Sequence, residues 1–243
     1  MKTFKLRYTN CYLIQHDCGW LLIDTGYEWE WEEFLAGLSS NGVSLSEITH
    51  LLITHAHDDH AGLLNHITEK NPNITIILSN IAASYLPGGV HIVKSGSGYV
   101  TRRMRLLASF KALFDRKWTH SYPCFQVRNH DKLISGQTKL SALGINLDGN
   151  VIPTPGHTDD SISLVTEEGD CYCGDAAANF FNIAGTHNCV IYVGCLKEYY
   201  ESWNSLLKTG VKRIYPAHGK PFPAALLIKE HGHHKQLYSS RHR

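Results

Sequence analysis

The feature that most constrains this chain is a run of metal-binding side chains at residues 54–62, THAHDDHAG. It follows the apolar stretch of residues 50–53, which predicts a short buried strand, and it precedes a helical pattern at residues 63–67. A loop at the end of a strand lets side chains converge on one point while rigid elements hold them. Imidazole and carboxylate groups are ligands of zinc and related metals, so the run predicts a metal site.

Backbone geometry divides the donors of this run into two groups. In an extended backbone, residues two apart point to the same side, so we expect His55 and His57 to meet at one ion. Asp59 and His60 lie just past the turn and should face a second ion, whereas Asp58 should contribute little. Only 16 of the 243 residues are histidine, so chance is a poor explanation for so dense a pattern.

Composition limits the class of protein. A chain of 243 residues with 43% hydrophobic and 19% charged residues can bury a sizeable core and fits one α/β domain better than two. A net charge of +1 gives no general attraction for nucleic acid. No apolar stretch is long enough for a membrane span, and residues 1–8 lack the apolar core of a secretion signal. Seven cysteines then indicate reduced thiols in a cytoplasmic protein.

Strand and helix signals alternate along the chain, which predicts an α/β fold with partly parallel sheets. The expected strands are residues 10–15, 20–24, 50–54, 74–78, 125–128, 132–134, 151–152, 161–165, 170–173 and 212–215. The expected helices are residues 28–38, 60–70 and 198–207. Cys171 and Cys173 lie one residue apart in an expected strand, and structural thiols explain them better than a metal clip does.

Residues 95–125 interrupt this rhythm. The sequence SGSG at residues 95–98 favours a hinge, and a helix is expected after it. One face of that helix would carry Val100, Met104, Leu107 and Phe114. The other face carries several of the arginines and lysines between residues 102 and 117. Two interpretations stay open: a solvated basic face, or a lid over the metal cleft that favours an anionic substrate.

Five motifs, in this order, resemble those of the metallo-β-lactamase-fold hydrolases. They are Asp24-Thr25-Gly26, residues 54–62, Pro155-Gly156-His157-Thr158, Gly174-Asp175 and Pro216-Ala217-His218-Gly219. The strand and helix pattern fits the αββα four-layer sandwich of that family, in which two mixed β-sheets pack face to face with helices outside. We expect residues 1–243 to form one such domain, with a helical insertion or lid at about 95–125.

The resemblance also implies a ligand set for two ions. The first ion would be bound by His55, His57 and His157. The second would be bound by Asp59, His60 and His218. Asp175 would bridge the ions, because a bridging carboxylate and hydroxide offset the repulsion between two cations about 3.5–4 Å apart. Asp24 would orient ligands through hydrogen bonds.

The implied activity is hydrolysis of an ester-like bond in a small molecule, by a hydroxide that two Zn²⁺ ions share. Zinc lowers the pKa of bound water to about 7, and Asp59 would relay the proton as the catalytic residue. True β-lactamases carry a cysteine where this chain has Asp175. This difference favours the glyoxalase II and lactonase-like branch, acting on a thioester, lactone or other carboxylic ester. The tail after His218 is shorter than the helical region that glyoxalase II uses to hold glutathione.

Other functions stay open. The same fold supports phosphodiesterases and mononuclear iron dioxygenases that act on persulfides, and iron or manganese would suit these donors too. A flavodiiron-type reductase is less favoured, because His57 stands where that branch carries an acid. A non-catalytic binder would leave buried charge without a metal, at considerable cost. A small-molecule substrate is the expected partner, with no nucleic acid and no membrane; the oligomeric state stays undetermined.

A few polar residues are harder to assign. Tyr192, His187 and His120 are either pocket residues or ordinary packing. Asp159 and Asp160 are expected to be ordinary turn residues. The histidines near the C-terminus are expected to form a surface tail.

Overall fold

The computed structural model describes residues 1–93, 96–106 and 120–231. Its strands form two six-stranded sheets and one short two-stranded sheet. The first sheet has the order β1 (Lys2–Lys5), β2 (Asn10–His16), β3 (Gly19–Ile23), β4 (Ile48–Leu52), β5 (Thr75–Ser79) and β7 (Lys132–Ile134). The second has the order β14 (Phe222–Pro223), β13 (Arg213–Pro216), β11 (Asp170–Gly174), β10 (Ile162–Thr166), β9 (Gly149–Pro153) and β8 (Thr138–Lys139). The short sheet pairs β12 (Tyr192–Val193) with β6 (Gly98–Tyr99).

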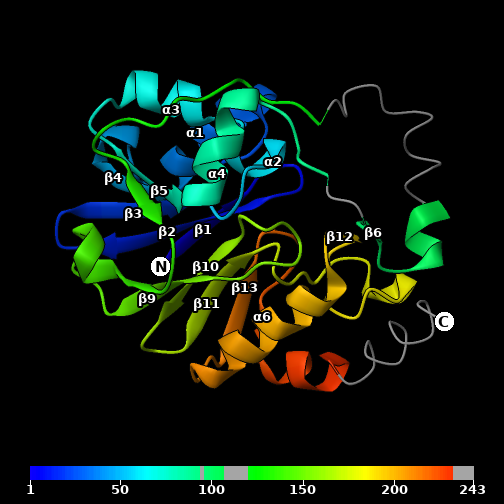
Figure 1. Ribbon diagram of the computed structural model, residues 1–243. Helices are drawn as coiled ribbons and strands as arrows, with labels where there is room; N and C mark the ends of the chain where they lie inside the picture. Colours follow the sequence, from blue (N-terminus) through cyan, green and yellow to red (C-terminus); the bar gives the residue numbers. More distant parts are fainter. Residues whose placement is uncertain (94–95, 107–119, 232–243) are drawn as a thin grey trace.

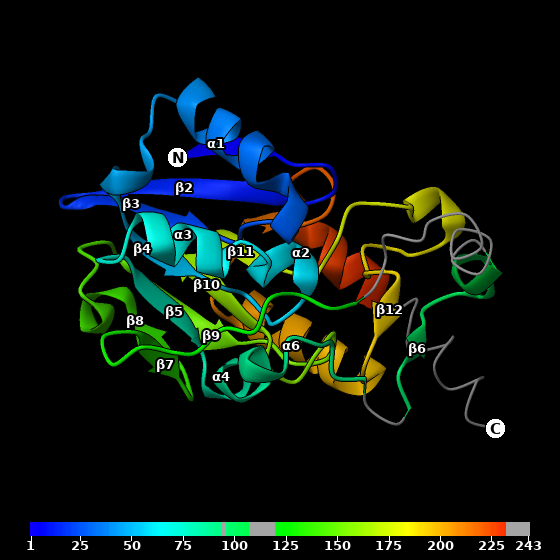
Figure 2. The ribbon, with the colours of Figure 1, turned by 90° about the horizontal axis from the view of Figure 1, so that it is seen from above.

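Helices cover the outer faces of both large sheets. The α-helices are α1 (Trp31–Ser40), α2 (Asp58–Ala61), α3 (Leu64–Lys70), α4 (Asn80–Tyr85) and α6 (Leu196–Lys208). Short 3-10 turns are η1 (Glu28–Glu30), η2 (Leu45–Glu47), η3 (Leu86–Gly88), η4 (Leu140–Leu143) and η5 (Asn182–Ala184). Figure 1 shows α1 to α4 on the side of the first sheet and α6 on the side of the second. Seen from above, α1, α3 and α4 lie side by side (Figure 2). The predicted αββα sandwich is therefore confirmed.

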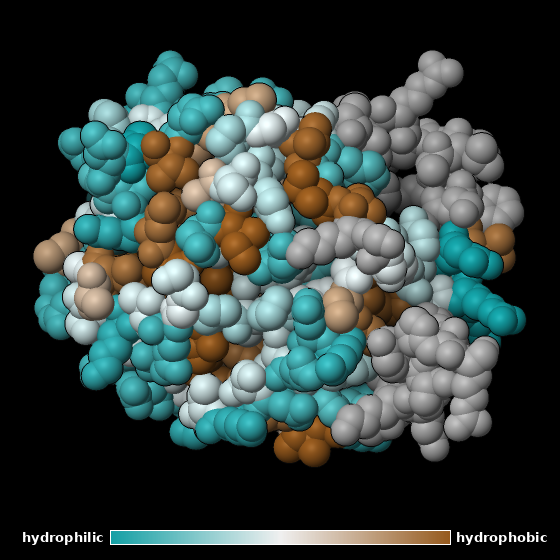
Figure 3. Space-filling model, viewed as in Figure 1, coloured by the Kyte–Doolittle hydropathy of each residue, from teal (hydrophilic) through white to brown (hydrophobic). Residues whose placement is uncertain are grey.

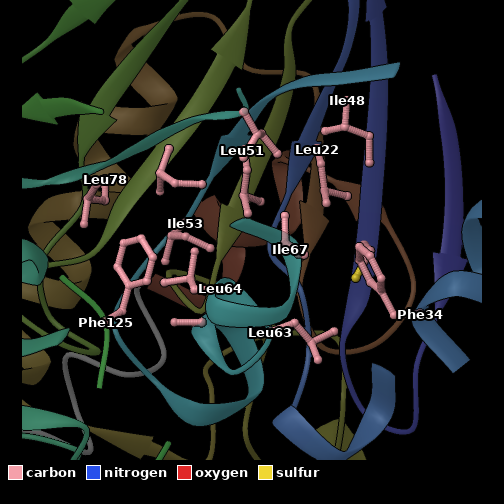
Figure 4. Packing of buried hydrophobic residues seen from close by; sticks show 14 of the residues in the cluster. Leu22, Phe34, Ile48, Leu51, Ile53, Leu63, Leu64, Ile67, Leu78 and Phe125 are labelled. Atoms are coloured by element: carbon pink, nitrogen blue, oxygen red, sulfur yellow. The ribbon is translucent and has the colours of Figure 1, made fainter. Parts of the chain in front are cut away.

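Both faces of strand β4 are buried, which explains its uninterrupted apolar sequence. Leu51 belongs to the cluster that also contains Phe34 of α1 and Leu64 of α3, as Figure 4 shows. Leu52 belongs to a second cluster, which includes Leu164 of the opposite sheet. Parallel pairing of β4 with β3 and β5 places it in the interior of its sheet. Strands covered on both faces lose the polar alternation seen at a solvent-facing sheet.

The predicted helix over residues 60–70 is divided into α2 and α3, and Gly62 lies at the break. The carbonyl oxygen of His60 accepts hydrogen bonds from the backbone N–H and the hydroxyl of Thr25, at 3.0 and 2.7 Å. The hydroxyl of Thr25 also accepts the N–H of Leu63 at 3.3 Å. A Cβ on Gly62 would come within 2.6 Å of the Gly26 carbonyl oxygen. The turn after β3 therefore occupies hydrogen bonds that a continuous helix would use.

The strand predicted at residues 125–128 is wrong, because these residues pair with no strand in the described part of the chain. The N–H of Phe125 bonds instead to the carbonyl oxygen of Leu86 at 3.0 Å, and its ring enters the cluster under the helices (Figure 4). The N–H of Arg128 bonds to the carboxylate of Asp131 at 2.8 Å. The apolar pattern in this segment therefore reflects packing rather than strand pairing.

The predicted insertion at about 95–125 is described only in part. Residues 102–106 are helical, and Val100 and Met104 are buried as the sequence predicts. Leu107 and Phe114 lie outside the described residues. The lid, its basic face and the single-domain organisation stay predictions.

The surface and the thiols agree with the composition. Hydrophobic residues on the face shown in Figure 3 form separate patches among hydrophilic ones. In the described residues no helix is both long and apolar enough to cross a membrane. Cys171 and Cys173 are buried free thiols in β11, as expected for packing residues. The cytoplasmic location stays a prediction.

Candidate metal centre

The seven predicted ligands lie in segments that follow strands. His55, His57, Asp59 and His60 come after β4. The other three follow β9, β11 and β13, and they are His157, Asp175 and His218. Loops after strands of both sheets meet at one edge of the sandwich, where rigid strands fix the start of each loop. The fold thus brings together residues up to 163 positions apart, from His55 to His218.

Ligand atoms of these residues converge in three overlapping groups, with the atoms of each group within 4.8 Å of one another. The groups are His55–His57–His157, His55–His60–Asp175 and Asp59–His60–His218. The first and third are the two predicted triplets. His57 presents Nδ1 to its group, at 3.0 Å from Nε2 of His55 and 3.1 Å from Nε2 of His157. The sequence did not indicate which ring nitrogen of His57 would face the centre.

Asp175 spans the two triplets. Its Oδ2 lies 3.3 Å from Nε2 of His157, and its Oδ1 lies 3.3 Å from Nε2 of His218. The side chain is buried. One carboxylate therefore presents an oxygen to each triplet, which is the arrangement that a bridging ligand requires.

Two buried polar atoms in this centre lack a hydrogen-bond partner among the described residues: Nε2 of His60 and Oδ1 of Asp175. They lie 3.7 Å apart, too far for a hydrogen bond. Buried polar atoms are nearly always satisfied, so an unpaired donor set aimed at one point needs a further partner. A cation fits this requirement, because imidazole and carboxylate atoms ligate the same divalent metals.

The charge around the two triplets differs. Burial and the neighbouring histidines hold the pKa of His55 and His57 well below the usual value. Burial opposes charge on His60 as well, but the carboxylates of Asp59 and Asp24 outweigh it and raise its pKa to about 10. His218 follows the same pattern, and its carboxylate neighbours raise its pKa to about 9. The acidic side of the centre therefore attracts positive charge, either as protons on histidine or as bound cations.

Hydrogen bonds outside the centre orient the ligands. Asp24 is buried, its carboxylate accepts the backbone N–H and the hydroxyl of Thr54 at 2.8 Å each, and its Oδ2 lies 2.9 Å from Nδ1 of His60. Nδ1 of His157 donates to the carbonyl oxygen of Tyr192 at 2.9 Å. Because a carbonyl can only accept, this bond leaves the lone pair of His157 on Nε2, which faces the centre. Tyr192 thus contributes its backbone, and Asp24 has the orienting bonds that the resemblance implied.

His91 is a neighbour of the centre that sequence reasoning missed. Its ring stacks on that of His57, with centroids 3.9 Å apart, and its Nε2 lies 3.0 Å from Oδ1 of Asp58. His120 lies beyond it, 5.2 Å from His91 between ring centroids. His187 instead pairs with Glu230 at 2.6 Å and belongs to none of the ligand groups. No motif surrounds His91, so the sequence offered no signal for it.

Asp160 is not the ordinary turn residue that we expected. Its side chain is buried, and its Oδ2 accepts the backbone N–H of Ala56, between the two ligands of the first motif, at 2.7 Å. Burial raises the pKa of this carboxyl group. Asp159 also has a tertiary partner, since it accepts the hydroxyl of Tyr85 at 2.8 Å. The turn after His157 therefore fixes the backbone of the metal loop.

Replacing Asp160 by alanine should destabilise the protein by about 1–3 kcal/mol, because the buried N–H of Ala56 would lose its acceptor. Urea unfolding of the two proteins gives this difference as a shift of the midpoint at constant slope. The exposed Asp148→Ala variant is the matched control and should stay within about 0.5 kcal/mol of the parent. Equal midpoints for both variants would contradict this role of Asp160.

A cleft adjoins the centre. Its volume is about 460 Å³, and its lining residues are Tyr27, Glu28, Trp29, Asp58, Ser121, Tyr122 and Pro123. Asp58 stands between the ligands His57 and Asp59, so the cleft begins next to the donor set. The rings of Tyr27 and Trp29 stack at 5.0 Å and form an aromatic wall. Asp58 is therefore a cleft residue rather than a bystander.

Comparison with known proteins gives the family of this chain. Residues 5–218 match the sequence model of the metallo-beta-lactamase superfamily. The chain is 27% identical over 168 residues to the uncharacterized protein YobT of Bacillus subtilis, covering 69% of this chain and 61% of that protein. It is 29% identical over 138 residues to the lactamase-like protein adaB of Aspergillus niger, covering 56% and 40%. The chain thus spans less than two thirds of the length of these relatives.

Solved structures share the fold. A metallo-beta-lactamase family protein from Thermus thermophilus superposes with a TM-score of 0.65 at 18% identity, covering 96% of this chain and 78% of that one. The subclass B3 metallo-beta-lactamase BJP-1 of Bradyrhizobium japonicum gives a TM-score of 0.63 at 15% identity, covering 96% and 87%. At such identities the likeness concerns the fold alone.

Proposed function

Because this chain belongs to the metallo-β-lactamase superfamily, we propose that it is a metal-dependent hydrolase that uses two zinc ions to cleave an ester-like bond of a small molecule. The bond would be that of a thioester, a lactone or another carboxylic ester. The observation that carries this proposal is the convergence of two triplets of ligand atoms around the unpaired atoms Nε2 of His60 and Oδ1 of Asp175. An ordinary polar cluster would have satisfied those atoms internally.

In this proposal the donors divide as the two triplets do. His55, His57 and His157 would hold one ion, and Asp59, His60 and His218 the other, with Asp175 between them. Two bound ions would supply the positive charge that acidifies the attacking water and polarises the substrate carbonyl oxygen. Each triplet leaves coordination positions for water and substrate, as a catalytic rather than a structural site requires.

Asp59 is the residue that we propose as the proton acceptor. Burial favours its neutral form, but His60 and His218 outweigh burial and lower its pKa, so the carboxylate is ionised. Its Oδ1 lies 3.5 Å from Nε2 of His60, and its Oδ2 lies 3.2 Å from Nε2 of His218. This position inside the centre lets the carboxylate take a proton from the attacking water and pass it to the leaving group.

The glyoxalase II and lactonase-like branch remains part of the proposal. Asp175 supports it, because a carboxylate stands where true β-lactamases carry a cysteine. We also propose a cytoplasmic protein without a nucleic-acid partner. The free thiols and the net charge of +1 support this part of the proposal.

A metal analysis followed by a hydrolysis screen tests this function. Protein purified without chelator should contain about two zinc ions per chain and should hydrolyse members of a panel of thioesters, lactones and aryl esters. Phosphodiesters and β-lactams belong in the same panel. One iron per chain, with persulfide oxidation and no hydrolysis, would replace this proposal by a dioxygenase. A protein that binds no metal would refute both.

The cleft beside Asp58 should hold the part of the substrate that does not react. Trp29→Ala should therefore raise KM for an aryl ester by roughly tenfold and leave kcat nearly unchanged, since uniform binding affects KM alone. Steady-state kinetics measures both constants. The exposed Ile228→Ala variant, which lies outside the cleft, is the control. A change in kcat without a change in KM would contradict this use of the cleft.

A further inference from the structure

The loop that carries His218 is held by the turn between β1 and β2. Residues 8–10 form this turn, in which the N–H of Leu6 bonds to the carbonyl oxygen of Thr9 at 2.9 Å. The turn lies about 210 residues away in sequence from the loop that it contacts, yet all three of its residues bond to the acidic side of the centre or to its loop. No motif of the resemblance includes this turn.

Asn10 bonds to the loop on both sides of His218. Its side-chain Nδ2 donates to the carbonyl oxygen of Pro216 at 3.0 Å and to that of Gly219 at 2.7 Å. Its backbone N–H donates to the carbonyl oxygen of Ala217 at 2.8 Å. Asn10 is buried, so water does not substitute readily for these bonds. Both side-chain partners are pure acceptors, which identifies the amide nitrogen as the atom that faces them.

The two residues before Asn10 contact the ligands themselves. Nδ1 of His218 donates to the carbonyl oxygen of Tyr8 at 3.1 Å, which leaves the lone pair on Nε2, the atom facing Asp59 and Asp175. Thr9 is fully buried, and its hydroxyl donates to Oδ2 of Asp59 at 3.3 Å. The turn therefore orients two members of the triplet Asp59–His60–His218.

The other triplet is held from different elements. Nδ1 of His157 bonds to the backbone of Tyr192, and Nδ1 of His55 lies 3.2 Å from the hydroxyl of Thr54. Asp160 holds the N–H of Ala56. The supports of the two triplets thus come from separate parts of the chain, and a change in residues 8–10 should affect them unequally.

We propose that Asn10 and Thr9 are positioning residues for the triplet Asp59–His60–His218, and that their loss weakens the ion bound there selectively. The inference rests on the proposed metal-dependent function. Loss of an orienting partner typically reduces metal affinity by about 10–100-fold. Asn10→Asp is the sharpest change, because it keeps the size but places a carboxylate oxygen against two carbonyl oxygens. Thr9→Val keeps the shape and removes only the hydrogen bond to Asp59.

Metal titration tests this proposal without any measurement of turnover. Metal-free protein is titrated with Co²⁺ in competition with a chelator, and both binding events and the visible spectrum are recorded. Asn10→Asp should weaken one event by about 10–100-fold and leave the other within about twofold. Thr9→Val should weaken the same event to a smaller extent. Asn150→Asp on β9 is the matched control for an equal change of charge and should alter neither event.

The spectrum identifies the triplet that is affected. Cobalt that remains bound to Asn10→Asp should give the spectrum of His218→Ala and differ from that of His157→Ala. If Asn10→Asp does not fold, as judged by circular dichroism, Thr9→Val decides alone. Equal weakening of both events, or none in either variant, would overturn this inference while leaving the proposed function standing. Wild-type protein that binds fewer than two ions would overturn the proposed function and this inference with it.

Discussion

Asp59→Asn should lower kcat by about 10²–10⁴-fold, the range that a positioned proton acceptor contributes. The amide keeps the size of the side chain but removes the negative charge that pairs with His60 and His218, at 3.5 and 3.2 Å. It also removes the group that would take a proton from the attacking water. Because the change acts on the reaction rather than on binding alone, kcat and kcat/KM should fall together in steady-state assays.

Asp58→Asn is the matched control, since it makes the same change one residue earlier in the same helix. Asp58 lines the cleft and pairs with His91, but it belongs to none of the ligand groups. It should change KM by less than about tenfold and leave kcat nearly intact. Equal losses of kcat in the two variants would mean that the catalytic carboxylate has been assigned to the wrong residue.

Removal of metal should have the second large effect. Ions that bind the folded centre but not the unfolded chain stabilise the protein by about 4 kcal/mol when present at a thousand times their Kd. For a domain of this length each kcal/mol changes Tm by about 2–4 °C, so chelation should lower Tm by roughly 8–16 °C. Hydrolysis should stop at the same time, because the charge that activates water would be lost.

Calorimetry with and without chelator measures this difference. Zinc added back in excess over the chelator should restore both Tm and activity, which separates metal loss from irreversible unfolding. The variant His157→Ala should show a smaller decrease in Tm on chelation than the parent protein, since one triplet is already incomplete. An unchanged Tm after chelation of the parent would refute the assignment of these residues to a metal centre.

Local patterns were enough for the centre of this protein. Residues 54–62 combine a buried strand end with alternating donors, and both features depend on a few neighbouring residues. The same holds for β4, β11 and β13, whose apolar runs predicted strands that the structure contains. Resemblance then supplied the pairing of His157, Asp175 and His218 with this run, and the fold brings their ligand atoms within reach.

Interactions between distant parts of the chain were not visible in this way. The helix predicted over residues 60–70 is broken because Thr25 takes the carbonyl oxygen of His60. The apolar residues after position 124 pack against helices and pair with no described strand. Neither outcome changes the local pattern of the segment, so no local rule could have detected it.

By itself, the sequence determined the donor set, the strand ends that carry it and the layered α/β architecture, because hydrophobic periodicity and ligand chemistry are written in short segments. Only the tertiary structure decided which atoms hold those donors in place. Asp160 supports Ala56 across 104 residues, and Asn10 bonds to Pro216 across 206. Such bonds depend on how two sheets pack and on which loops meet at their edge. A buried carbonyl or N–H accepts whichever partner the fold brings to it, and the folded geometry alone specifies that partner.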